Sequence, residues 1–124
     1  MDLRQKIRLP SGKLTSVGNI IGYFYDLSET DITVLENTIS KGKVEADQLE
    51  KELSISRSTL NMSLNKLHSL GFLEKKRGEV KHTGRPKYIY SVSANVKEKI
   101  KKELEDIFKE VIDATSGKKV VTSA

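Results

Sequence analysis

Cysteine is absent from this chain of 124 residues, which also lacks tryptophan and has only two prolines. Without thiolates the chain can form neither a disulfide framework nor a cysteine-ligated metal site. The two histidines, His68 and His82, lie too far apart to act as paired metal ligands on one helix, and neither has a nucleophile at a recognisable spacing. We therefore expect no metal, no cofactor, no catalytic residues and no enzymatic activity, and no small-molecule ligand is evident.

Long hydrophobic runs are missing as well. The longest apolar stretch, residues 17–25, is interrupted by Gly18, Asn19 and Gly22 and is much shorter than the roughly 20 residues that span a bilayer. No charged start leads into an apolar run and a small-residue cleavage site, so nothing indicates secretion. The sequence therefore predicts a cytoplasmic protein.

Positive charge is concentrated in one segment. The formal net charge is +5, and residues 75–87 (KKRGEVKHTGRPK) alone hold six Lys or Arg and one Glu. The other 111 residues carry 16 basic and 16 acidic groups and so cancel. A cationic segment punctuated by glycine suits a polyanionic duplex, because each neutralised phosphate releases condensed counterions. Charge runs are also common on solvated surfaces, so this reading depends on the neighbouring elements.

The length fits one small, largely helical domain with one appended element. Residues 1–13 are basic and contain Pro10 and Gly12, which predicts an extended arm. Apolar residues then recur at helical spacing and predict a first helix over residues 14–27. Arm and helix together form an N-terminal part, residues 1–27, ahead of the main domain.

The next segment has the pattern of a helix-turn-helix motif. Ser28, with Asp31 three residues later, signals the start of a second helix. A third, short helix is predicted over residues 44–53. A tight turn then leads to a fourth helix over residues 57–70, with Ser56 as its cap. Two helices joined by a three-residue turn are typical of helix-turn-helix proteins.

Beyond Gly71 the pattern changes from helical to extended. Residues 72–76 and 88–92 are predicted to be two strands joined by the basic loop, and we call this hairpin the wing. A long helix follows over residues 94–116, and residues 117–124 are expected to be a flexible tail. The predicted fold class is mainly α with a small β-hairpin, that is, α+β.

The fourth helix presents two different faces. Its core face is made of leucines, namely Leu60, Leu64 and Leu67. The opposite face and its flanks carry short polar residues instead of the Glu and Lys that clothe most exposed helices. Because Asn can bond adenine edges and Ser or Thr can reach bases or phosphates, we expect this face to read bases in the major groove. The predicted contact residues are Arg57, Ser58, Thr59, Asn61, Met62, Asn65 and Lys66.

The wing carries a second set of predicted contacts. Gly84 allows close backbone approach, Pro86 stiffens the strand entry, and Arg85 is the side chain favoured in a narrow, electronegative minor groove. The other cations would contact phosphates, which position a protein without specifying sequence. The predicted wing contacts are Lys75, Lys76, Arg77, Lys81, His82, Arg85 and Lys87.

The segments SISRSTLNMSLNKLHSLGFLEKK and GRPKYIYSV resemble the winged-helix transcription regulators of bacteria and archaea. The resemblance covers a predicted DNA-binding domain over residues 28–93. The layout, with one helix before this domain and a long one after it, most resembles the small archaeal Lrs-like (biofilm-regulator type) proteins. This resemblance implies homodimers joined through terminal helices and binding to promoter DNA. Ser54 is a departure, because many relatives have glycine in that turn.

The last predicted helix supplies a candidate dimer interface. Its apolar residues are spaced alternately by four and three, as in the seam of a coiled coil, and ~20 residues at a rise of 1.5 Å span roughly 30 Å, more than a domain of this size covers. The seam residues are Ile100, Leu104, Ile107, Val111 and Ala114. Packing of this helix back on its own domain is the alternative.

The leading hypothesis is a homodimeric, DNA-binding transcription regulator that is cytoplasmic and associated with the nucleoid, with double-stranded DNA as its partner. An architectural, chromatin-like protein that coats DNA with little sequence choice is one alternative, and the polar reading face argues against it. A protein-interaction winged helix inside a transcription assembly is another, and it would not need so cationic a wing.

Overall fold

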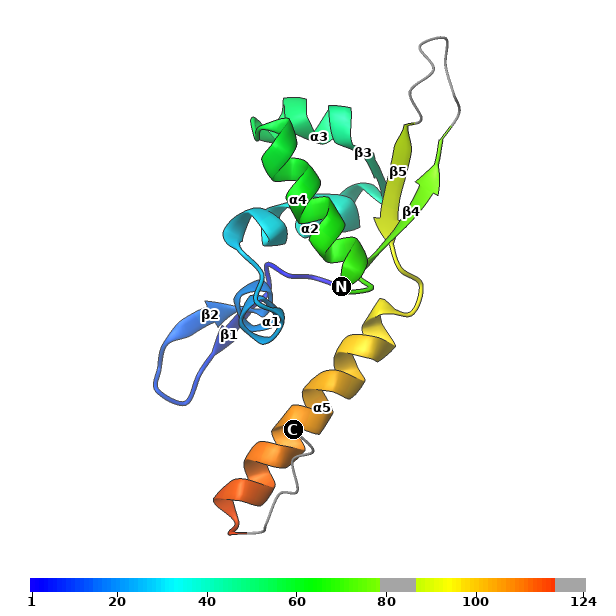
Figure 1. Ribbon diagram of the computed structural model, residues 1–124. Coiled ribbons are helices and arrows are strands. Elements are labelled where there is room, and N and C mark those ends of the chain that lie inside the picture. Colours follow the sequence, from blue (N-terminus) through cyan, green and yellow to red (C-terminus); the bar gives the residue numbers. More distant parts are fainter. Residues whose placement is uncertain (79–86, 118–124) are drawn as a thin grey trace. The chain divides into compact units, whose positions relative to one another are not determined.

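The structure, a computed structural model, describes residues 1–78 and 87–117, and the chain divides into the units Met1–Ser93 and Ala94–Ala124 (Figure 1). The first unit contains, in chain order, β1 (Lys6–Arg8), β2 (Leu14–Ser16), α1 (Val17–Tyr25), α2 (Glu29–Lys41), β3 (Lys43–Glu45), α3 (Ala46–Leu53), α4 (Arg57–Ser69), β4 (Leu73–Arg77) and β5 (Tyr88–Val92). The second unit contains α5 (Val96–Thr115). Within the first unit, α2, α3 and α4, the turn between α3 and α4, and the antiparallel sheet of β3, β4 and β5 confirm the predicted α+β winged helix-turn-helix.

Helix α2 begins where the sequence predicts. The Ser28 hydroxyl accepts a hydrogen bond from the Asp31 amide at 3.1 Å, and the Asp31 carboxylate accepts one from the Ser28 amide at 2.9 Å. This reciprocal capping box satisfies two amides that would otherwise lack partners. Inside the helix, Val34 and Leu35 are buried in the core against α4.

Helix α4 also confirms its local signals. Ser56 accepts from the Thr59 amide at the start, and the helix is followed by Gly71, whose φ of 83° is in the left-handed region. The predicted core leucines Leu60, Leu64 and Leu67 are fully buried. Each such burial stabilises the fold by about 1.5–3 kcal/mol, so this face holds α4 in place and leaves its other face to solvent.

The turn between α3 and α4 uses a left-handed residue. Ser54 has φ 51° and ψ 40°, a conformation that costs most side chains free energy but costs glycine little. A glycine at this position would adopt the same conformation at a lower cost.

The sheet has three strands in the order β3, β5, β4, all antiparallel. The strand prediction for residues 88–92 is confirmed to the residue, and β4 starts one residue later than predicted. The prediction of a helix over residues 44–53 is wrong at its start, because Val44 pairs with Tyr90 in β3 and α3 begins only at Ala46. A three-residue strand is too short to show an alternating pattern, and its partner is far away in sequence.

The N-terminal prediction needs a larger correction. Residues 1–13 do not form an extended arm, since β1 and β2 pair as an antiparallel hairpin whose turn contains Gly12 at φ 91°. The first helix begins at Val17, with Ser16 as its cap, and not at residue 14. The Leu3 carbonyl accepts from the Gly18 amide at 2.8 Å, and a Cβ at Gly18 would lie only 3.0 Å from that oxygen. Glycine therefore lets the N-terminal segment lie directly on α1.

The described part of the second unit contains α5, a helix of 20 residues, followed by Gly117 at φ 77°. Lys99 and Glu103 form an ion pair one turn apart at 2.7 Å. The C-terminal half of α5 exposes four large apolar side chains, namely Ile107, Phe108, Val111 and Ile112. Among the described residues, no helix combines the length and apolarity needed to cross a membrane.

Candidate nucleic-acid interface

The outward face of α4 is polar and accessible. Its exposed side chains include those of Arg57, Ser58, Thr59, Asn61, Met62 and Asn65. Met62 is 74% exposed, which is unusual for so large an apolar side chain on a helix that otherwise shows short polar groups. Six of the seven residues predicted for this helix therefore share one solvent-facing surface.

A groove of about 700 Å³ lies between α4 and the wing. It is lined by Glu45, Ala46, Asp47, Arg57, Asn61, Asn65, Lys75, Lys87, Tyr88 and Tyr90. Three of these residues, Arg57, Asn61 and Asn65, belong to the predicted reading face of α4. Two others, Lys75 and Lys87, belong to the predicted contacts of the wing, so the groove brings residues of both sets together. We call this feature the α4–wing groove.

On the wing side of the groove, Lys75 is held over aromatic rings. Its ammonium lies 4.1 Å from the centroid of the Tyr88 ring and 5.8 Å from that of Tyr90. A contact of this kind contributes about 0.5–1 kcal/mol at an exposed site. Because Lys75 and Tyr90 are also directly opposite in the β4–β5 register, the strand pairing keeps the two side chains together in the lining of the groove.

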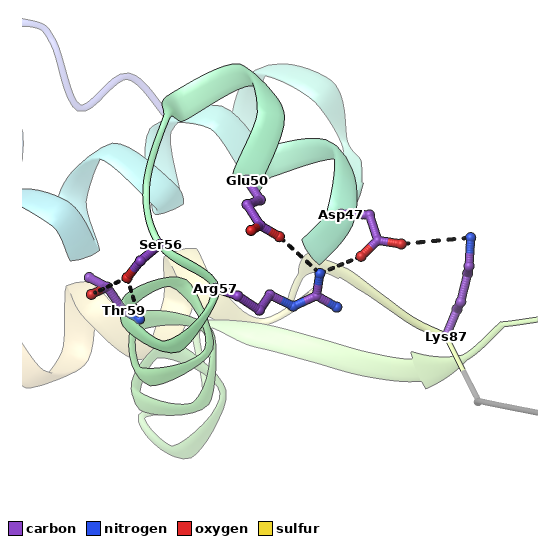
Figure 2. Close-up of polar contacts among 6 residues, drawn as sticks. All are labelled: Asp47, Glu50, Ser56, Arg57, Thr59 and Lys87. Carbon is purple, nitrogen blue, oxygen red and sulfur yellow. Dashed lines mark hydrogen bonds and ion pairs between the residues drawn. The ribbon is translucent and has the colours of Figure 1, made fainter.

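At the start of α4, Arg57 is engaged by carboxylates of α3 (Figure 2). Its guanidinium donates to Asp47 and lies 3.2 Å from the Glu50 carboxylate. Lys87, the residue before β5, approaches the same Asp47 with 3.8 Å between Nζ and Oδ2. The hydrogen bond from Arg57 lowers the pKa of the Asp47 carboxyl, and the bond to Asp47 raises the pKa of Arg57, so both groups are charged at neutral pH.

These carboxylates are neighbours of a predicted contact residue that the sequence did not reveal. Asp47 precedes Arg57 by ten residues, and only the folded helix-turn-helix brings them into contact. The only hint in the sequence is the acidic composition of residues 45–52, which offers carboxylates as partners for a nearby cation.

Lys66 is placed differently from the other predicted helix residues. Its ammonium pairs with the Asp31 carboxylate at 3.3 Å and donates to the Asp26 carbonyl. Ser63 donates to the same carboxylate at 2.6 Å. Burial raises the pKa of Asp31, but the bonds from Ser63, Ser28 and Lys66 outweigh it, and the pKa lies below its usual value of 3.8. Lys66 thus fixes α4 to α2.

The remaining wing residues divide into two groups. Lys76 and Arg77 are exposed on β4 but do not line the groove. Lys81, His82 and Arg85 lie outside the described residues, as do Gly84 and Pro86.

The predicted seam residues all lie in α5. Ile107 and Val111 are 41% and 53% exposed. Phe108 and Ile112, which the sequence reasoning did not include, are also exposed and widen the stripe beside them.

Solved structures support the fold. A possible transcriptional regulator from Methanosarcina mazei Go1 matches with TM-score 0.70 and 22% identity over 92% of this chain and 93% of that one. A protein from the archaeon Sulfolobus tokodaii matches with TM-score 0.64 and 28% identity over 78% and 92% of the two chains. A transcriptional regulator homologue from Pyrococcus horikoshii OT3 matches with TM-score 0.52 and 18% identity over 78% and 93%. No curated protein matches.

The family comparison extends over most of the chain. The model of the TFIIE alpha subunit family matches residues 16–119, which include the helix-turn-helix, the wing and α5. Its description and those of the structural neighbours concern transcription and not catalysis. Because this match covers most of the chain and agrees with the observed fold, the chain belongs to the TFIIE alpha subunit family of winged-helix transcription proteins.

Proposed function

We propose that this protein is a homodimeric transcription regulator that binds double-stranded DNA, with α4 in the major groove and the wing on the minor groove or the phosphates. One observation carries the proposal: the polar face of α4 and the cations of the wing line the same groove. A duplex offers base edges and phosphates side by side, so an interface of this composition matches both at once.

The residues of α4 supply the base contacts in this proposal. Asn61 and Asn65 lie one helical turn apart, and both are exposed on the groove. An asparagine amide can donate to and accept from one adenine, which is worth about 1–3 kcal/mol of discrimination per base. Met62, between them in sequence, gives an apolar surface that suits a thymine methyl group.

The wing supplies the phosphate contacts. Lys75 and Lys87 line the groove, and Lys76 and Arg77 extend the cationic surface along β4. The role of Lys81, His82 and Arg85 remains a prediction from sequence.

The dimer is proposed to form through the apolar stripe of α5. Ile107 and Val111 of the predicted seam are exposed, and exposed neighbours on the same helix widen the stripe. A second copy of the chain would cover it, and we then expect the two α4 helices about one DNA turn apart, roughly 34 Å, or a multiple of that. The Lrs-like subtype and a cytoplasmic, nucleoid-associated location belong to the same proposal.

A second candidate is a winged helix that binds protein inside a transcription assembly. Two observations favour it: the family is named for a subunit, and the carboxylates of α3 offset the charge of Arg57. The architectural, DNA-coating alternative gains no such support.

Footprinting across the promoter of the protein's own gene, together with duplex binding by Asn61→Ala and Asn65→Ala, tests the proposal. We expect a bounded protected region, and we expect both variants to lose discrimination between that site and random DNA more than they lose affinity for random DNA. Asn19→Ala, which removes an exposed asparagine from α1, is the matched control. Failure of the wild-type protein to bind any duplex at low salt would favour the protein-binding candidate.

A further inference from the structure

The α4–wing groove contains two cations that share one carboxylate. Arg57 approaches Asp47 from the first turn of α4, and Lys87 approaches it from the residue just before β5 (Figure 2). Glu50, one turn further along α3, is the second acceptor for Arg57. A carboxylate flanked by an arginine and a lysine from different elements occupies the kind of place where a phosphate group is commonly bound.

These contacts are open to exchange. The side chains of Arg57, Asp47 and Lys87 are each about half exposed, so none of them is locked in the core. Ion pairs of this accessibility are weak, because water and salt compete with both partners. A phosphodiester oxygen can therefore replace Asp47 at the guanidinium without disturbing the packing of either helix.

The charge balance of the groove shows that the carboxylates oppose the entry of a phosphate. Its lining holds three cations and two carboxylates, and Glu50 adds a third negative charge at Arg57. A phosphate that enters next to Asp47 gains an attraction to Arg57 and Lys87 but also meets a like charge, which opposes binding.

We propose that Asp47, with Glu50, is a phosphate-mimicking gate: in the free protein the two carboxylates occupy the phosphate seat formed by Arg57 and Lys87, and they restrain its affinity for DNA. The inference rests on the proposed DNA-binding function and assigns α3 a role in it. The occupant of the seat in the complex is a backbone phosphate, so the restraint acts on all sequences equally and leaves discrimination to α4.

The alternative for these contacts is a purely structural one, in which the two carboxylates only hold α3 against the start of α4. The two roles predict opposite effects on binding. If the carboxylates act as a gate, their removal strengthens DNA binding. If they only brace the structure, their removal frees the Arg57 side chain and weakens DNA binding.

The test is fluorescence-anisotropy titration of a labelled random-sequence duplex of about two helical turns, at several salt concentrations, with full-length Asp47→Asn. We expect binding about 3- to 10-fold tighter than wild type, because one like charge leaves the phosphate path. A plot of the logarithm of the association constant against the logarithm of the salt concentration should become steeper by about 0.9, the value for one more neutralised phosphate. Glu50→Gln should shift affinity in the same direction and serves as the second variant if Asp47→Asn folds poorly.

A control variant separates the gate from general charge effects. Glu74→Gln removes one exposed negative charge from β4, whose side chains alternate in direction so that Glu74 faces away from Lys75, and it should leave affinity within about twofold of wild type.

The outcomes are distinct. Wild-type binding with equal or weaker binding by both Asp47→Asn and Glu50→Gln overturns the gate and leaves the DNA-binding proposal standing. No binding by wild type or any variant at low salt overturns the DNA-binding proposal and the gate with it. Tighter binding by both variants, with unchanged Glu74→Gln, supports the gate.

Discussion

Ser63→Ala tests how α4 is held in its orientation. The Ser63 hydroxyl donates to the buried Asp31 carboxylate at 2.6 Å, and Asp31 belongs to the capping box of α2. A hydrogen bond to a charged group contributes about 1.5–3 kcal/mol, and its loss leaves a buried carboxylate with one donor fewer. We therefore expect Ser63→Ala to lower the free energy of unfolding by about 1.5–3 kcal/mol.

Urea denaturation followed by circular dichroism measures this change, with Ser58→Ala as the matched control. Ser58 is on the same helix but exposed, so its removal should cost less than about 0.5 kcal/mol. Because the folded pKa of Asp31 lies below 3.8, its contribution is present above that pH and is lost as the pH falls further. Equal stability of the two variants at pH 7 would refute the reasoning that Asp31 joins α2 to α4.

Two further predictions concern binding and assembly. Arg85→Ala should weaken duplex binding by about 1–3 kcal/mol at matched salt, because a guanidinium in the minor groove is lost, and unchanged affinity would remove the wing tip from the interface. Leu104→Glu combined with Ile107→Lys should convert a dimer of twice 13.9 kDa to a folded monomer with much weaker DNA binding, as avidity is lost. A molecular mass of 13.9 kDa for the wild type, measured by light scattering, would contradict the dimer.

The accurate predictions were those that depended on local signals. Helix α4 follows from its serine cap, its leucine spacing and Gly71, and β5 follows from a run of aromatic and β-branched residues. The capping box of α2 is likewise contained in four consecutive residues. In each case the residues that determine the element are its own neighbours.

The errors arose where pairing with another segment, and not the segment's own residue pattern, determines the structure. Strand β3 forms because Val44 pairs with Tyr90. The N-terminal hairpin forms because β1 pairs with β2, and the buried Leu3 lies next to Gly18. Three-residue strands carry too little pattern to be seen before the partner is known. The contact of Asp47 with Arg57 was hidden for the same reason, and so was the pairing of Lys66 with Asp31.

The central claim, that α4 and the wing contact the same duplex through the residues that line the α4–wing groove, is tested most directly by a ¹H–¹⁵N NMR titration of the labelled protein with a duplex. The account predicts that the side-chain amides of Asn61 and Asn65 and the backbone amides of Lys75 and Lys87 shift together at substoichiometric DNA, while Asn19 on α1 does not. Shifts confined to the β1–β2 hairpin or to α5, with the groove signals unchanged, would contradict it.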